Sequence, residues 1–146
     1  MILKEFTPEI YPRKIWLVIP QKQKDYNAIV DRFTAYNFAV SKNTKLAQDK
    51  FLERIRIGRS AVLAECWPVE EKESTDYGIL CIIHEPPNMD ASHFAHESVH
   101  IADYICEQLG LLTQDFTEGN EAYAYLVGYI MTCFMDIIEQ YNKTVK

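Results

Sequence analysis

Hydrophobic positions follow two different rhythms along this chain of 146 residues, and each rhythm predicts one kind of element. Runs rich in β-branched and aromatic residues predict three strands, at residues 11–19, 61–69 and 77–84. Apolar side chains three or four positions apart predict helices, at residues 25–36, 43–57, 90–109 and from about 117 to 141. The charged run 70–76 suits a solvated hairpin loop between the second and third strands.

The helix predicted at residues 90–109 has the clearest ends and two contrasting faces. Asp90 is suited to cap its N-terminus, and Gly110 is suited to end it in the left-handed conformation. One face collects polar and titratable side chains, namely His93, His96, Glu97, His100, Asp103 and Tyr104. The opposite face is apolar, so we expect this helix to pack on the core and to line a cleft.

The last predicted helix is apolar on most of its sides, which favours a place in the core. Its longest apolar run, Ala122 to Met135, is shorter than the roughly 20 residues of a membrane span, so we expect no membrane partner. The first residues have neither an apolar stretch nor a small-residue cleavage site, so we expect no secretory signal. No repeat or linker divides the chain. We therefore expect one α+β domain over residues 1–146, with a small mixed sheet.

Composition narrows the choice of partner and compartment. The formal net charge of −6 argues against nucleic acid as a partner, because phosphate binding needs a basic surface. The cysteines, which are Cys66, Cys81, Cys106 and Cys133, form no C-x-x-C pair, and each has apolar neighbours. We interpret them as small buried hydrophobic residues in a reducing compartment, which predicts a cytoplasmic protein.

The candidate chemistry lies in the sequence His-Glu-Ser-Val-His at residues 96–100. Residues four apart on a helix lie almost above one another, so His96 and His100 can bind one metal ion. Glu97 lies close enough to reach a water bound to that ion, which is the arrangement of zinc metallopeptidases. The alternative is a chance pairing of two histidines on a solvated helix face, because five-residue patterns also recur by chance.

A third metal ligand is predicted on the last helix. Glu121 stands near the start of that helix, after a short polar connection. Two helices joined by a short loop form an antiparallel pair, so Glu121 could reach back to the histidines and leave a fourth zinc position for water. Glu118, one turn earlier, is the fallback ligand. The alternative is that Glu121 only stabilises the N-terminus of its helix.

His96-Glu97-x-x-His100 followed by Asn120-Glu121 resembles the gluzincin metallopeptidases, whose third ligand is a Glu on a second helix, often preceded by Asn. The compact size resembles the single-domain minigluzincins, and residues 92–129 also resemble small zincin-like proteins encoded by phages and prophages. The resemblance implies a zincin-like fold and one Zn²⁺ per chain, bound by His96, His100 and Glu121. It also implies that Glu97 is the general base and that the substrate is a peptide or protein.

The chain departs from the family pattern in its supporting residues. Larger gluzincins often carry an Asp four residues after the ligand Glu, where this chain has Tyr125. Asp103 is one candidate that would support a zinc-bound histidine instead. Larger gluzincins also bring a His or Tyr from another domain to the oxyanion. Here the candidates for that function are Tyr104, Tyr123, Tyr125 and Tyr129.

Several functions remain open from the residues. The leading one is zinc-dependent peptide hydrolysis, with the strand at 77–84 aligning an extended peptide by β-augmentation. One alternative is a binding or structural protein that keeps the zincin scaffold without turnover, in a phage or prophage programme. Another is a peptidase-like subunit completed by a partner chain. We interpret His93 as a neighbour at the cleft rim and His84 as a structural residue at a strand end.

Overall fold

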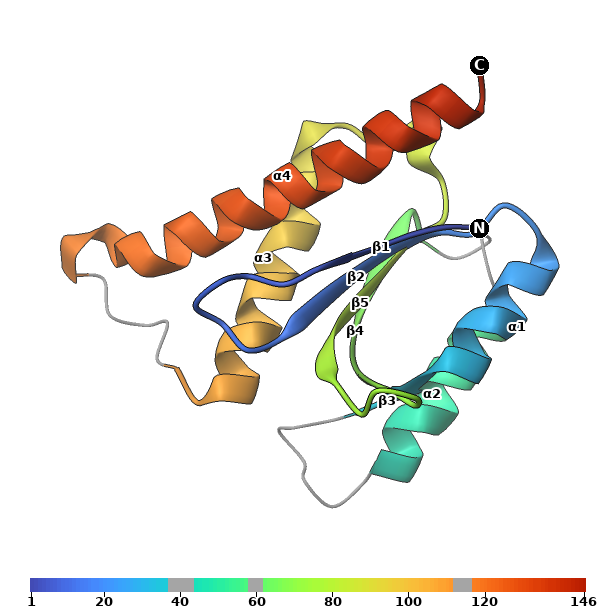
Figure 1. Ribbon diagram of the computed structural model, residues 1–146, viewed down its shortest axis with the longest axis horizontal. Coiled ribbons are helices and arrows are strands. Elements are labelled where there is room, and N and C mark those ends of the chain that lie inside the picture. The colour runs from blue at the N-terminus through green and yellow to red at the C-terminus, as the bar shows by residue number, and fades with distance from the viewer. Residues whose placement is uncertain (37–43, 58–61, 112–116) are drawn as a thin grey trace.

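A computed structural model describes residues 1–36, 44–57, 62–111 and 117–146 (Figure 1). Within these residues the strands are β1 (Ile2–Phe6), β2 (Lys14–Ile19), β3 (Phe33–Ala35), β4 (Ala64–Glu71) and β5 (Tyr77–Ile83). The α-helices are α1 (Gln23–Arg32), α2 (Thr44–Ile57), α3 (Ala91–Leu109) and α4 (Glu121–Thr144). Short 3₁₀ helices, η2 (Pro86–Asn88) and η3 (Thr117–Asn120), precede α3 and α4.

The strands form one mixed sheet in the order β1-β2-β5-β4-β3. β2 and β5 run parallel, whereas the other neighbouring strands are antiparallel. This confirms the predicted α+β class with a small mixed sheet.

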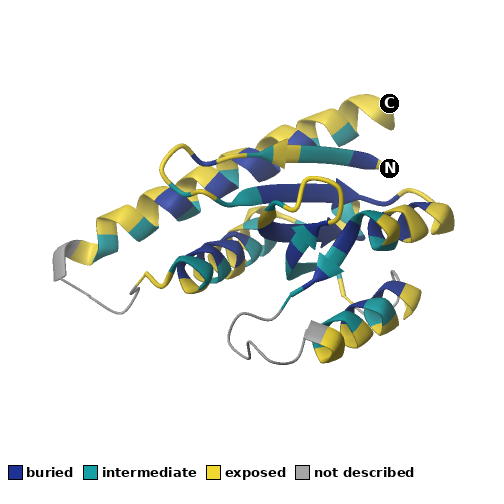
Figure 2. Ribbon diagram, turned by 60° about the horizontal axis from the view of Figure 1, so that its bottom comes forward, coloured by how far each residue is buried: buried dark blue, intermediate teal, exposed yellow. Residues whose placement is uncertain are grey.

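Helices cover both faces of the sheet, α3 and α4 on one side and α1 and α2 on the other (Figure 1). Along β2, Ile15 and Leu17 face α3 and α4, whereas Trp16 and Val18 face the other pair. β2 and β5 are therefore buried along almost their whole length (Figure 2). Strands covered on both faces need apolar residues at successive positions, which explains their unbroken apolar runs.

Two strands differ from the prediction. Residues 33–35 form β3, although the pattern predicts a helix as far as residue 36. Phe33 is fully buried, packs edge-on against Trp16 and pairs with Glu71 of β4, so tertiary packing overrides the helical pattern. The sequence does not predict β1, because the polar pair Lys4 and Glu5 interrupts its apolar pattern.

The last helix begins later than predicted. Residues 117–120 form η3, so α4 starts at Glu121 and extends to Thr144. Of the polar connection predicted at residues 113–120, residues 113–116 lie outside the described residues. By length and composition alone α4 could cross a membrane, but a core helix passes the same test. Here Leu126, Ile130 and Phe134 of α4 are buried against the sheet and α3.

Gly78 permits the close contact between β5 and β2, and we expect its replacement to be costly. A Cβ at Gly78 would lie 2.0 Å from the Lys14 carbonyl oxygen and 2.8 Å from Cζ3 of Trp16. Gly78→Ala should therefore lower the free energy of unfolding by about 3 kcal/mol in urea denaturation. Gly128→Ala is the matched control, since nothing lies within 4 Å of its Cβ position. The control should be neutral or stabilise by up to about 1 kcal/mol. Equal stability of the two variants would contradict this account.

Both predicted ends of the histidine-bearing helix are confirmed. Asp90 is the N-cap of α3, and its carboxylate accepts hydrogen bonds from the backbone N–H of Ser92 and of His93, at 2.9 and 3.3 Å. Gly110 ends the helix with a left-handed φ of 66°. The sequence thus encodes the limits of the element that carries the candidate site.

The Asp90 cap should make stability depend on acid pH. Hydrogen bonds from Ser92 and His93 lower the pKa of Asp90 from 3.8 to about 2. Because the folded-state pKa is the lower one, the cap stabilises the fold above pH 3.8 and is lost as the pH falls towards 2. In thermal unfolding across this range, Asp90→Ala should lose less stability on acidification than the wild type. Asp49→Ala, at an exposed position of α2, is the control and should lose as much stability on acidification as the wild type. If Asp90→Ala also loses as much stability as the wild type, the cap effect is excluded.

Candidate metal centre

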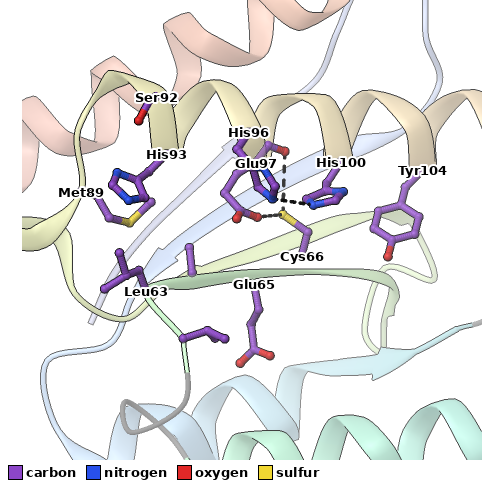
Figure 3. Close-up of a pocket in the computed structure, with 12 residues that line it drawn as sticks. Leu63, Glu65, Cys66, Met89, Ser92, His93, His96, Glu97, His100 and Tyr104 are labelled. Atoms are coloured by element: carbon purple, nitrogen blue, oxygen red, sulfur yellow. Dashed lines mark hydrogen bonds between the residues drawn. The ribbon is translucent and has the colours of Figure 1, made fainter.

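The histidine face of α3 lines a cleft of about 600 Å³ between this helix and β4 (Figure 3). His96, Glu97, His100 and Tyr104 project into the cleft from α3. Its other wall is formed by residues 62–66, at and before the start of β4. The predicted cleft beside the histidines is therefore present.

His96 and His100 face each other at the cleft. Their Nε2 atoms are 2.9 Å apart, and both side chains are exposed to solvent. Two nitrogens bound to one tetrahedral zinc ion at about 2.0–2.1 Å would be roughly 3.3 Å apart. The separation between the two histidines is close to that value, so the pair fits a zinc ion with little rearrangement.

Glu97 lies half-buried beside the histidine pair and contacts β4. Its Oε2 accepts a hydrogen bond from the Cys66 thiol at 3.1 Å (Figure 3). The same sulfur lies 4.0 Å from the Glu97 carbonyl oxygen. Glu97 therefore lines the same cleft as the two histidines, with a thiol partner that the sequence does not predict.

Cys66, Cys81 and Glu97 form a group that could hold a metal ion. One ligand atom from each lies within 4.8 Å of the others. Among the described parts of the chain, no other group of three or more His, Cys, Asp or Glu residues lies this close together. Burial raises the pKa of both thiols, and the nearby Glu97 carboxylate raises them further. The four cysteines are all unpaired thiols, and three of them are buried as predicted, whereas Cys66 is only half-buried.

The structure does not bring Glu121 to the histidines. Glu121 is exposed on the first turn of α4, does not line the cleft, and forms no group with His96 and His100 within 4.8 Å. The cause is helical phase, because five positions separate Glu121 from the buried Leu126, which turns it about 140° away from the packed face. The ligand set predicted with Glu121 is therefore incomplete in this arrangement. The side chain of the fallback ligand, Glu118, lies outside the described residues.

The predicted supporting residues have other contacts. Asp103 accepts a hydrogen bond of 2.6 Å from the Tyr123 hydroxyl, which ties α3 to α4. Burial and this carboxylate both raise the pKa of Tyr123. Tyr125 and Tyr129 are exposed on α4, beside Ile10, and do not line the cleft. Tyr104 is the candidate for oxyanion support that lines the cleft.

The strand beside the cleft is β4, not the predicted one. Residues 77–84 contain β5, which pairs with β2 on one side and β4 on the other, so its backbone cannot pair with a peptide. β3 pairs with β4 at Val69–Glu71, and the backbone N–H of Tyr36 donates to the Pro68 carbonyl at 2.8 Å. Within the described chain, no strand pairs with the outer edge of β4 over residues 64–67. Among the described residues, the strand edge beside the cleft that no other strand pairs with is therefore this part of β4.

Two other histidines have structural contacts. His93 lines the cleft rim, and its Nδ1 lies 2.8 Å from the Asp90 carboxylate at the helix cap. His84 is buried, 2.8 Å from the Tyr26 hydroxyl and 2.9 Å from the Glu65 carboxylate. Both placements agree with the interpretation of His93 as a neighbour at the cleft rim and of His84 as a structural residue at a strand end.

Comparisons of the chain with protein-family models, with curated proteins and with solved structures give no match. The proposed function therefore rests on the residues that line the cleft.

Proposed function

We propose that this chain is a zinc-dependent peptidase, in which His96 and His100 bind the zinc ion and Glu97 is the general base. The observation that carries the proposal is the 2.9 Å approach of the two Nε2 atoms inside a cleft that also contains the Glu97 carboxylate. Neutral imidazoles are common zinc ligands. The α+β fold, with this helix packed on a mixed sheet, suits the zincin-like architecture of the proposal.

A bound zinc ion would lower the pKa of water towards about 7 and would polarise a peptide carbonyl. Glu97 would accept the proton of the attacking water and pass it to the leaving amine. Tyr104 lines the same cleft and is the side chain proposed to donate a hydrogen bond to the developing oxyanion.

The outer edge of β4 gives the proposed peptide substrate a binding site. An extended peptide would add to residues 64–67 as a further strand, with its backbone beside the histidines. Main-chain hydrogen bonds of this kind select an extended backbone more than a sequence. The proposed substrate is therefore an unfolded or flexible protein segment.

The experiment that tests this function is hydrolysis of an unfolded protein or a peptide library by zinc-loaded chain, with the chain stripped by a chelator as the control. Cleavage that appears with zinc and disappears on chelation supports the peptidase. If the zinc-loaded wild type and the zinc-loaded Cys66→Ser variant both cleave nothing, the result favours the second candidate, a binding protein on a zincin scaffold. That candidate is favoured by one observation, the hydrogen bond that Cys66 already makes to Glu97.

Glu121→Gln tests how far the chain follows the gluzincin ligand set. Because Glu121 lies outside the cleft, we expect the variant to keep its zinc content, measured by elemental analysis, within about twofold of the wild type. Glu139→Gln, at another exposed position of α4, is the control. Loss of zinc from Glu121→Gln alone would show that the first turn of α4 turns towards the histidines when the metal binds.

A further inference from the structure

Two thiols lie beside Glu97 on the sheet side of the cleft, and the proposed hydrolysis does not use them. Cys66 of β4 and Cys81 of β5 occupy directly paired positions on antiparallel strands. Both side chains face α3, where the Cys66 sulfur meets the Glu97 carboxylate (Figure 3). The sheet thus presents two sulfur atoms and the helix presents one oxygen to the same point.

We propose that Cys66, Cys81 and Glu97 form a second metal site, distinct from the histidine pair, which takes a thiophilic divalent cation such as Zn²⁺ or Cd²⁺. Thiolate and carboxylate are both accepted ligands of zinc, and thiolates favour soft cations over Mg²⁺ or Ca²⁺. The proposal goes beyond the proposed peptidase and does not depend on it.

The geometry needs little change to hold an ion. At a Zn–S distance of about 2.3 Å and a Zn–O distance of about 2.0–2.2 Å, ligand atoms of a tetrahedral site lie roughly 3.4–3.8 Å apart. The Cys66 sulfur lies 3.1 Å from Oε2 of Glu97, and all three ligand atoms lie within 4.8 Å of one another. Side-chain rotations can therefore close the site without movement of the strands.

The surroundings suit a cation. Cys81 is fully buried, while Cys66 and Glu97 are half-buried and reach the cleft, which gives an entry path. Glu65, the next acidic side chain along β4, is already bound to His84 and Arg54. Binding would release two protons, one from each thiol, and together with the Glu97 carboxylate the occupied site would carry one net negative charge. The fourth position would face the cleft.

Occupancy of this site would inhibit the proposed hydrolysis. A Glu97 carboxylate bound to the second ion could not accept a proton from water. Excess zinc or cadmium would therefore suppress turnover while the histidine pair stays occupied.

The test is a Cd²⁺ titration of the full-length chain under reducing conditions, followed by thiolate-to-metal charge-transfer absorption in the ultraviolet. We expect a band that saturates near one equivalent of thiolate-bound ion. Loss of a residue that only supports a ligand typically weakens metal binding about 10–100-fold, so Cys66→Ser should weaken this site by about 100-fold or more. Cys106→Ser, at a buried cysteine outside the group, is the matched control and should keep the band.

A second pair of variants separates this site from the histidine pair. The double variant His96→Ala, His100→Ala should keep the charge-transfer band, because the thiol site does not use the imidazoles. The proposal is overturned if the wild type shows no band, or if Cys66→Ser keeps it while remaining folded by circular dichroism. It is also overturned if mass spectrometry finds a Cys66–Cys81 disulfide that persists under the reducing conditions. None of these outcomes bears on zinc binding by the histidines.

Discussion

Glu97→Gln is expected to keep zinc and to lose hydrolysis, with kcat lower by about 10²–10⁴-fold, the usual contribution of a general base. The amide has the shape of the carboxylate and can still accept a hydrogen bond from Cys66, so the local packing should survive. It cannot take a proton from water. The loss should therefore appear in kcat and leave the zinc content unchanged at one equivalent of added metal.

Glu107→Gln is the matched control for this variant, since Glu107 is exposed on the same helix and does not line the cleft. The control should keep full activity. A Glu97→Gln protein as active as the wild type would remove Glu97 from the mechanism. If the zinc-loaded wild type is as inactive as zinc-loaded Glu97→Gln, the result supports the alternative of a binding protein.

In a Cys66→Ser background, which removes the proposed thiol site, His100→Ala is expected to abolish zinc binding and the stability that zinc confers. A ligand present at 100 times its dissociation constant stabilises the folded state by about 2.7 kcal/mol. Zinc should therefore raise the melting temperature of the Cys66→Ser protein and leave that of the Cys66→Ser, His100→Ala protein unchanged. Thermal unfolding with and without zinc, combined with elemental analysis, measures both effects.

The chain offers a control on the same face of the same helix. His93 lines the cleft but is held by Asp90 at the cap, so His93→Ala should keep the zinc-dependent shift. In the Cys66→Ser background, a shift that survives His100→Ala, or that is lost equally with His93→Ala and His100→Ala, would show that the histidine pair is not the metal site.

Much of the helix that carries the site can be predicted from the sequence, because its determinants are local. Asp90 can bind the free N–H groups of its own first turn, and Gly110 can adopt a positive φ, wherever the helix packs. The convergence of His96 and His100 follows from helical spacing in the same way.

The rest of the site depends on contacts between segments that are distant in the sequence. Local patterns of hydrophobic and polar residues do not predict these contacts. From the sequence, Cys66 is interpreted as a buried apolar residue. Only the register of β4 and β5 shows that it lies beside Cys81 and in contact with Glu97. From the sequence, Glu121 is predicted to be a metal ligand. In the structure, the buried face of α4 that contains Leu126 turns Glu121 away from the histidines. The position of β4 rather than β5 beside the cleft likewise depends on the strand order, which places β5 inside the sheet.

The central claim, that His96 and His100 hold a zinc ion in the cleft, is tested most directly by a crystal structure of the chain with one equivalent of zinc and anomalous data at the zinc edge. The account predicts an anomalous peak about 2.0–2.1 Å from Nε2 of both histidines. Data that show zinc elsewhere, with neither imidazole bound to it, would contradict the account.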